Sequence, residues 1–263
     1  MKRGVLTLLL GFFLAYIGIM GYIYLTQEAQ IFNLKAIEPY EKIQEVGIES
    51  LRLEVQGATL EGVRRPALEP NAPLLFYFGG NANDATRFTQ YAKALKGYEI
   101  ICFNYRGYGK SSGEPSEKVL FEDALLIYDT YAKDNSVVLV GRSLGSGVAS
   151  YVASKRKVQG LVLITPYDSI SSMAKEKYPF LPIDFLLKHT FNSLQYISSV
   201  RASVAVIEVT NDTTIPRFHL ERLLEAMPHK PYHVSLTHTT HGKVLSHPDF
   251  TAHLQNILGK FYE

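Results

Sequence analysis

The chain has 263 residues, 46% of them hydrophobic, and a formal net charge of +2. This length suits one α/β domain with a small additional piece. A near-neutral chain without a basic stripe argues against a nucleic acid or an acidic polymer as the main partner. The single cysteine, Cys102, excludes an intrachain disulfide, and its apolar neighbours predict a buried structural thiol.

The first 30 residues predict a membrane segment. Lys2 and Arg3 precede an uncharged, mostly apolar run over residues 5–24, and about 20 such residues can span a bilayer as a helix. We expect an uncleaved signal anchor over residues 1–30 and the main domain over residues 31–263. The positive-inside rule then places this domain outside the cytoplasm, on the periplasmic or extracellular side. Cleavage, which would give a secreted protein, is the alternative.

Apolar runs alternate with helical patterns along the rest of the chain. Residues 31–42 connect the anchor to the domain, and residues 51–55 and 59–63 predict an antiparallel hairpin at a sheet edge. Later strands are predicted at residues 74–78, 99–105, 137–140, 161–165, 204–209 and 233–236. Helices are predicted at residues 85–95, 116–131, 217–227, after residue 143 and from residue 248. This alternation predicts a parallel sheet with helices on both faces.

Residues 169–199 interrupt the alternation of strands and helices. They carry aromatic and aliphatic residues among lysines, and we expect a small helical cap. Its apolar side chains could line an acyl-binding cleft or pack onto the sheet.

The most informative motif is Gly141-Arg142-Ser143-Leu144-Gly145. It follows a buried strand and precedes small residues typical of a closely packed helix. A Gly-x-Ser-x-Gly motif between a strand and a helix is typical of a nucleophile elbow. The glycines allow a tight turn that exposes the Ser143 hydroxyl. A serine is a weak nucleophile alone, so this prediction requires a base, an orienting acid and an oxyanion site elsewhere.

Candidates for the acid and the base follow the later strands. Asp212 is the preferred acid, and Asp168 is the second choice. Asp212 could instead cap a helix or form an Asx-turn. Among the histidines after the last strand, we prefer His241 as the base, because a glycine follows it, over His238 and His247. His238 and His241 have no further ligand nearby, so no metal site is predicted.

The oxyanion site needs two backbone donors. We expect one to be the N–H of Leu144, directly after the nucleophile. The other is expected from the turn Gly79-Gly80-Asn81-Ala82, from the N–H of Asn81.

Two further features receive structural interpretations. The glycine-rich segment at residues 106–113 lacks the spacing of the known phosphate-binding loops, so we interpret it as a structural loop. Arg142, beside the nucleophile, could steer an anion or form an ion pair, and we favour the structural role.

Together these motifs resemble the α/β-hydrolase superfamily, in particular its membrane-anchored serine aminopeptidase-like branch. The matching segments are residues 79–83, 104–109, 141–147 and 212–216 with His241. The resemblance covers roughly residues 45–260, and the order Ser, Asp, His along the chain is that of these enzymes. It implies an eight-stranded, mostly parallel sheet and a triad of Ser143, Asp212 and His241.

Two positions depart from the family pattern. Gly79 stands where the family usually has histidine, so a side chain that would support the oxyanion loop is missing. Thr239 and Thr240 precede His241 where many relatives have small residues, which keeps His238 as an alternative base.

The sequence therefore predicts a serine hydrolase that needs no cofactor. The resemblance leaves open whether its substrate is an ester, a thioester, a lipid or a peptide-like amide, with a carboxylesterase-like activity favoured. An acyltransferase with the same triad and a non-catalytic binding protein of the same fold are the alternatives.

Overall fold

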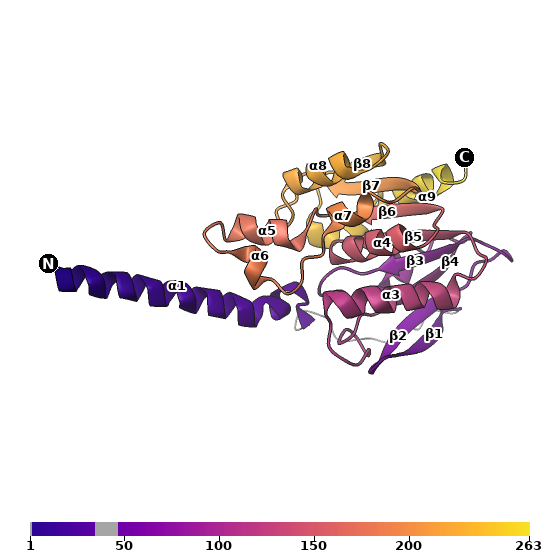
Figure 1. Cartoon of the computed structure of the whole chain (residues 1–263). Coiled ribbons are helices and arrows are strands. Elements are labelled where there is room, and N and C mark those ends of the chain that lie inside the picture. The colour runs from indigo at the N-terminus through magenta and orange to yellow at the C-terminus, as the bar shows by residue number, and fades with distance from the viewer. Residues whose placement is uncertain (1, 35–46) are drawn as a thin grey trace.

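A single helix projects from an α/β domain in the computed structural model, which describes residues 2–34 and 47–263 (Figure 1). This helix, α1 (Lys2–Ile31), is long and apolar enough between Arg3 and Ile31 to cross a membrane. The predicted connection over residues 31–42 lies largely outside the described residues. The division into an anchor and a domain near residue 30 stays a prediction.

The domain is built on an eight-stranded sheet in the order β1-β2-β4-β3-β5-β6-β7-β8. The strands are β1 (Glu49–Val55), β2 (Ala58–Arg65), β3 (Leu74–Phe78), β4 (Glu99–Phe103), β5 (Val137–Arg142), β6 (Gly160–Ile164), β7 (Ser203–Val209) and β8 (Tyr232–Leu236). β2 pairs antiparallel with β1 and with β4, and the other neighbours are parallel. The predicted eight-stranded, mostly parallel sheet and its edge hairpin are confirmed.

Helices cover both faces of this sheet. The central strands β3, β5 and β6 are buried at every residue, as expected for parallel strands enclosed on two sides. One face packs against α3 (Glu117–Tyr131), α4 (Leu144–Lys155), α7 (Ser193–Ile197) and α8 (Arg217–Ala226). The other packs against α2 (Phe88–Tyr91) and α9 (Phe250–Lys260). Cys102 is fully buried here, and burial raises the pKa of its thiol, as expected for a structural thiol.

The predicted helix over residues 85–95 is wrong in length. A short 3₁₀ turn, η2 (Ala85–Arg87), precedes α2, which ends at Tyr91. The guanidinium of Arg65 donates hydrogen bonds to the carbonyl oxygens of Ala92 and Leu95. The helix ends early because an arginine of the β1–β2 hairpin binds the carbonyl groups that follow it.

The predicted cap contains three short helices. α5 (Ile170–Lys177) and α6 (Ile183–Leu186) lie beside the end of α1, whereas α7 packs on α4 (Figure 1). α5 and α6 stand at the carboxyl ends of the parallel strands. In open α/β sheets this edge carries the ligand site.

Candidate active site

A strained turn presents Ser143 between β5 and α4. Its φ of 49° and ψ of −119° lie outside the regions that L-residues prefer. A Cβ atom on Gly145 would lie 2.1 Å from the carbonyl oxygen of Phe78, and one on Gly141 would lie 2.3 Å from that of Gly145. Both positions therefore require glycine, and the turn has the geometry of a nucleophile elbow.

Ser143, His241 and Asp212 meet at the carboxyl edge of the sheet. The Ser143 Oγ lies 2.9 Å from His241 Nε2, and His241 Nδ1 lies 2.7 Å from Asp212 Oδ2. The side chains of His241 and Asp212 are 12% and 9% exposed. With a proton on Nδ1, His241 donates to the aspartate and leaves Nε2 free to accept from the serine. The structure thus brings the three predicted side chains together, and their catalytic roles remain predictions.

Asp212 is held in its charged form. Burial alone would raise the pKa of this carboxyl group. The hydrogen bond with His241 and the N–H groups of Ile215 and Thr214 outweigh burial and keep the pKa below its usual value. A carboxylate fixed in this way can orient an imidazole and stabilise its cation.

The alternative residues lie elsewhere. Asp168 pairs with His219, at 2.8 Å between Oδ1 and Nδ1, and not with His241. His238 is exposed, with a φ of 57°, in a loop beside Thr210 and Asn211. His247 accepts a hydrogen bond from the N–H of Asp249 at the start of α9, as expected for a residue that begins a helix. Of the three histidines weighed as the base, His241 is the one that contacts Ser143.

The predicted oxyanion donors border the same space. Leu144 is the first residue of α4, where backbone N–H groups have no partner inside the helix. A Cβ on Gly80 would lie 3.3 Å from that of Ser143, so the turn before Asn81 passes next to the nucleophile. The Tyr105 hydroxyl donates to the Gly79 carbonyl at 2.9 Å and supports this turn. The roles of the Leu144 and Asn81 N–H groups remain predictions.

Arg142 connects two loops of the site. Its guanidinium donates to Asn83 Oδ1 at 2.8 Å and to the carbonyl oxygens of His241 and Gly242 at 2.9 and 3.1 Å. The side chain is buried, and these partners favour the structural interpretation, through hydrogen bonds to neutral groups in place of an ion pair.

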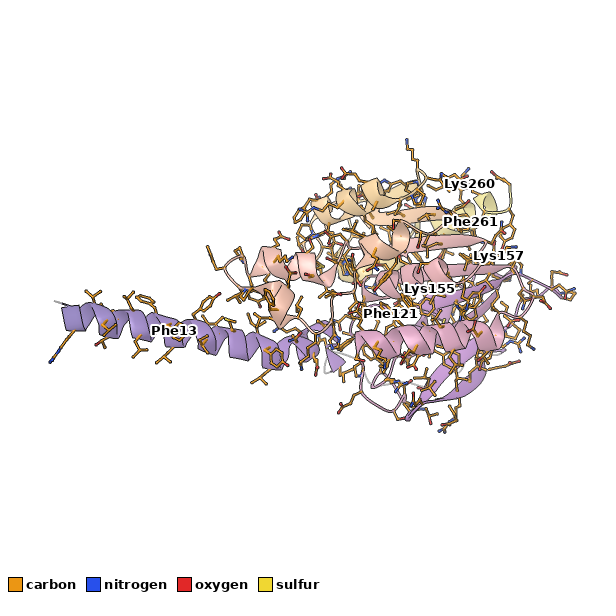
Figure 2. The ribbon with its side chains drawn as sticks, viewed as in Figure 1. Phe13, Phe121, Lys155, Lys157, Lys260 and Phe261 are labelled. Atoms are coloured by element: carbon orange, nitrogen blue, oxygen red, sulfur yellow. The ribbon has the colours of Figure 1, made fainter. Side chains whose placement is uncertain are left out.

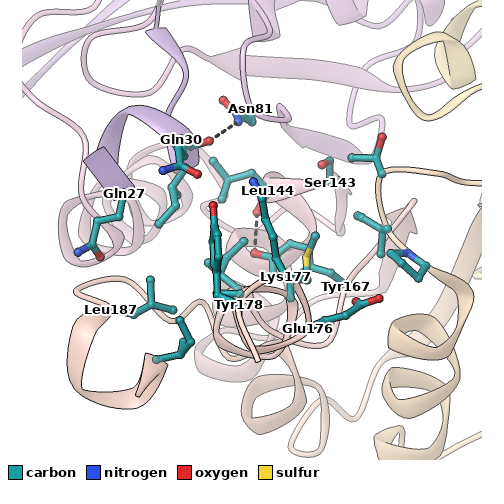
Figure 3. A pocket seen from close by; sticks show the side chains of 18 of the residues that line it. Gln27, Gln30, Asn81, Ser143, Leu144, Tyr167, Glu176, Lys177, Tyr178 and Leu187 are labelled. Carbon is teal, nitrogen blue, oxygen red and sulfur yellow. Dashed lines mark hydrogen bonds between the residues drawn. The ribbon is translucent and has the colours of Figure 1, made fainter. Parts of the chain in front are cut away.

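A cavity of about 590 Å³ extends from Ser143 between α1 and the cap (Figure 3). Half of its lining residues come from α1, α5 and α6, and its apolar walls include Ile23, Ile31, Ile170, Met173, Ile183 and Leu187. The apolar run of α1 predicts a membrane segment and gives no indication that this helix also forms a wall of the cavity. The available sign of this wall was the pair Gln27 and Gln30, two polar residues about one helical turn apart that follow the apolar run.

Two hydrogen-bonded contacts fix α1 to this cavity. The Gln27 amide donates to the carbonyl of Leu186, and its Oε1 accepts from the N–H of Lys188, at 3.0 and 2.8 Å. The Asn81 side chain donates to the carbonyl of Gln30 at 3.3 Å (Figure 3). α1 therefore contacts both the cap and the predicted oxyanion turn.

The glycine-rich segment at residues 106–113 has structural contacts. The Arg106 guanidinium makes two hydrogen bonds of 2.8 Å with Asp123, and the Tyr108 hydroxyl donates to the carbonyl of Phe32. Across residues 2–34 and 47–263, no three His, Cys, Asp or Glu side chains are grouped as metal ligands. A site that works without a metal stays a prediction.

The known proteins that resemble this chain point to one family. The sequence model of the α/β-hydrolase fold matches residues 73–195. An uncharacterized protein of Mycobacterium tuberculosis is 34% identical over 163 residues, which are 59% of this chain and 58% of that protein. The lysophosphatidylserine lipase ABHD12 of Rattus norvegicus is 28% identical over 232 residues, 74% of this chain and 58% of that protein. An uncharacterized membrane protein of Saccharomyces cerevisiae is 30% identical over 202 residues, with 72% and 69% covered.

Solved structures agree on the fold. A membrane phospholipase A superposes with a TM-score of 0.65 at 15% identity and covers all of both chains. An enol-lactonase from Burkholderia xenovorans superposes with a TM-score of 0.63 at 16% identity, over 80% of this chain and all of the other. The chain spans 58% of the length of the mycobacterial and rat relatives.

Proposed function

Because the chain belongs to the α/β-hydrolase superfamily, we propose that it is a membrane-associated serine hydrolase with a triad of Ser143, His241 and Asp212. The observation that carries the proposal is the chain of contacts from Ser143 Oγ through His241 to Asp212, at 2.9 and 2.7 Å. The strained elbow and the N-terminus of α4 beneath it add support.

The reaction proceeds through an acyl-enzyme. His241 Nε2 takes the hydroxyl proton while Ser143 Oγ attacks the carbonyl carbon of the ester. Negative charge moves to the carbonyl oxygen, where the N–H groups of Leu144 and Asn81 stabilise it. His241 then gives its proton to the leaving alcohol. Water attacks the acyl-enzyme with His241 again as the base, and the freed acid leaves Ser143 restored. Asp212 keeps the imidazole oriented and stabilises its cation throughout.

The favoured substrate is an ester with one long acyl chain. The cavity of about 590 Å³ lies within the range of about 300–1,000 Å³ that is usual for a single small ligand. Its aliphatic walls suit a hydrocarbon chain, and one wall belongs to the membrane helix. The names of two similar proteins, a lysophosphatidylserine lipase and a membrane phospholipase A, point toward lipids. The basic residues before the apolar run favour a catalytic domain outside the cytoplasm.

Replacement of the nucleophile tests this function. Ser143→Ala should reduce hydrolysis of nitrophenyl esters by about 10⁶-fold, the loss seen when a triad serine is removed. Ser146→Ala is the matched control, because this buried serine lies one turn along the same helix and bonds the Ser143 carbonyl. The control should retain most activity and both variants should melt near the parent temperature.

Labelling and product analysis separate the alternatives. A fluorophosphonate should label the parent and the Ser146→Ala variant but not Ser143→Ala. Turnover retained by Ser143→Ala, or a folded parent that is not labelled, would contradict a serine hydrolase. An ester series from acetate to palmitate, assayed with and without an added alcohol, measures the chain-length preference and whether water is the acceptor.

A further inference from the structure

The tip of the cap exposes two phenylalanines beside the membrane helix. The cap tip, residues 178–187, comprises the loop after α5 together with α6, and its Phe180 and Phe185 are 88% and 90% exposed. Neither side chain lines the cavity next to Ser143. Large apolar side chains exposed together mark an interaction surface.

Contacts along α1 define the depth of this tip. The first level lies near the C-terminal end of α1, where the Gln27 side chain forms hydrogen bonds with the backbone of Leu186 and Lys188. The Lys188 Nζ pairs with Glu28 at 3.1 Å and lies over the ring of Tyr24. Tyrosine and lysine side chains together are typical of a membrane–water interface.

At the other level, the Tyr16 hydroxyl donates to the carbonyl of Phe180 at 3.0 Å. Tyr16 precedes Gln27 by 11 residues, which is about 16 Å along a helix. Tyr16 also lies inside the uncharged run over residues 5–24 that would cross the bilayer. The cap tip therefore descends along α1 from the interface level into the level of the hydrocarbon.

The cap tip is suited to an apolar surrounding. Pro179 and Pro182 have no N–H group. Five of the other eight N–H groups, those of Tyr178, Leu181, Ile183, Phe185 and Leu187, donate hydrogen bonds to nearby carbonyl oxygens. Asp184, the one charged residue in this segment, is paired with Lys175 at 2.7 Å. Each backbone N–H group that has a partner lowers the cost of placing the segment in lipid.

We propose that the cap tip inserts into the leaflet on the C-terminal side of α1, with Phe180 and Phe185 in contact with acyl chains. The cavity between α1 and the cap then lies against the hydrocarbon, and a lipid ester reaches it without crossing water. The partner is the bilayer itself. Insertion is independent of the catalytic proposal, because its primary test measures depth and not turnover.

The absence of tryptophan allows a direct measurement of depth. The chain has no tryptophan, so Phe180→Trp and Phe185→Trp each introduce a single fluorophore at an exposed position. The full chain is reconstituted in phosphatidylcholine vesicles, with or without bromine near the methyl end of the acyl chains. Phe13→Trp is the positive control, because Phe13 projects from α1 (Figure 2). Leu68→Trp is the negative control, since Leu68 is 74% exposed in the β2–β3 loop at the opposite edge of the sheet.

We expect bromine to quench Phe180→Trp and Phe185→Trp about as strongly as Phe13→Trp and to leave Leu68→Trp unquenched. Quenching at Phe13 alone would overturn the proposal, because it would show a membrane-spanning helix with the cap tip in water. Two independent reporters guard against one variant that fails to fold.

A second readout uses the hydrolase reaction. The double variant Phe180→Ser, Phe185→Ser should lower turnover of a long-chain ester held in vesicles by about tenfold, equivalent to about 1.4 kcal/mol. Its turnover of a water-soluble short-chain ester should match the parent, because neither side chain lines the cavity. Equal turnover of the vesicle-held ester by parent and variant would contradict insertion.

Discussion

Asp212 and Asp168 make similar contacts, each with a histidine, at the carboxyl edge of the same sheet. The pairs measure 2.7 and 2.8 Å, and both aspartates follow a buried strand. They differ in what the histidine contacts next. His241 reaches the Ser143 hydroxyl, whereas His219 reaches the carboxylate of Glu176 at 2.9 Å. Similar local chemistry thus gives one histidine placed to accept a proton from a serine hydroxyl and one enclosed between two carboxylates.

These two aspartates make a matched experiment. Asp212→Asn should lower kcat by about 10⁴-fold, because an amide stabilises the wrong tautomer of the histidine and cannot stabilise its cation. Asp168→Asn should leave kcat within a few fold of the parent and lower the melting temperature instead. Steady-state kinetics and thermal melts on both variants separate the roles. A large loss of kcat in Asp168→Asn with full activity in Asp212→Asn would reverse the assignment of the acid.

At the residue scale, the sequence predicted the local features and missed the distant ones. Ser143 was recognisable because its neighbours along the chain are the glycines that its turn requires. His241 could be preferred because Gly242 follows it, although only the fold separates it from His238. The hydrogen bonds of the Arg142 guanidinium were not predictable, since its partners lie 59 to 100 residues away in the sequence.

At the scale of elements, a buried histidine holds the cap to the domain. His219 on α8 is fully buried and bonds both Asp168, after β6, and Glu176 on α5. Arg222 also faces this group and donates to Asp168 and to Ser172 on α5. Burial alone would lower the pKa of His219, but the two carboxylates outweigh it and raise the pKa above its usual value. Burial would raise the pKa of Asp168, yet its bonds with His219 and Ser172 hold it below the usual value.

The stabilisation by this histidine should depend on pH. A raised folded-state pKa means that the contribution is complete below the unfolded value, about 6.5, and is lost as the pH rises through the folded value. His219→Asn should lower the melting temperature at pH 6 by about 6 °C or more, from about 3 kcal/mol for a broken buried pair. The difference from the parent should shrink toward pH 9. His229→Asn, at an exposed histidine, is the control. A difference that stays constant between pH 6 and pH 9 would contradict a charged His219.

Element types were easier to predict than element lengths. The run of apolar residues at 74–78 predicted β3 with both of its ends correct, because a proline and a glycine border the run of buried residues that forms this strand. The segment at 85–95 has a helical pattern as well, but α2 ends at Tyr91, where Arg65 of the edge hairpin binds the following carbonyls. A tertiary partner decided the end of that helix.

For the whole molecule, the alternation of strands and helices predicted a parallel sheet covered on both faces, and the resemblance of the motifs implied the α/β-hydrolase fold with eight strands. The contacts between α1 and the cap were not predicted, because an uncharged run indicates a possible membrane segment but not which residues its end contacts. Gln27 is 3% exposed and connects α1 to the cap through two hydrogen bonds. This contact between α1 and the cap, here called the seam, is therefore part of the structure of the site.

Loss of this glutamine should loosen the cap. Gln27→Ala removes two seam hydrogen bonds at about 1 kcal/mol each, which corresponds to about 30-fold more frequent local opening. Trypsin cleavage after Lys177 and Lys188 in detergent should accelerate accordingly. Thr26→Ala is the control, because its hydroxyl bonds Tyr22 within the same helix. Equal cleavage rates in the two variants would show that the seam does not hold the cap.

Two contacts at different heights, Tyr16 with Phe180 and Gln27 with Leu186, also fix the rotation of α1 about its axis. One residue inserted between them would turn the outer part of the helix by about 100° relative to the inner part, so one contact would break. An insertion before Tyr16 would leave both in place. The spacing between these two side chains is thus a fixed length in the chain, whereas neither contact constrains the length of the stretch that precedes Tyr16.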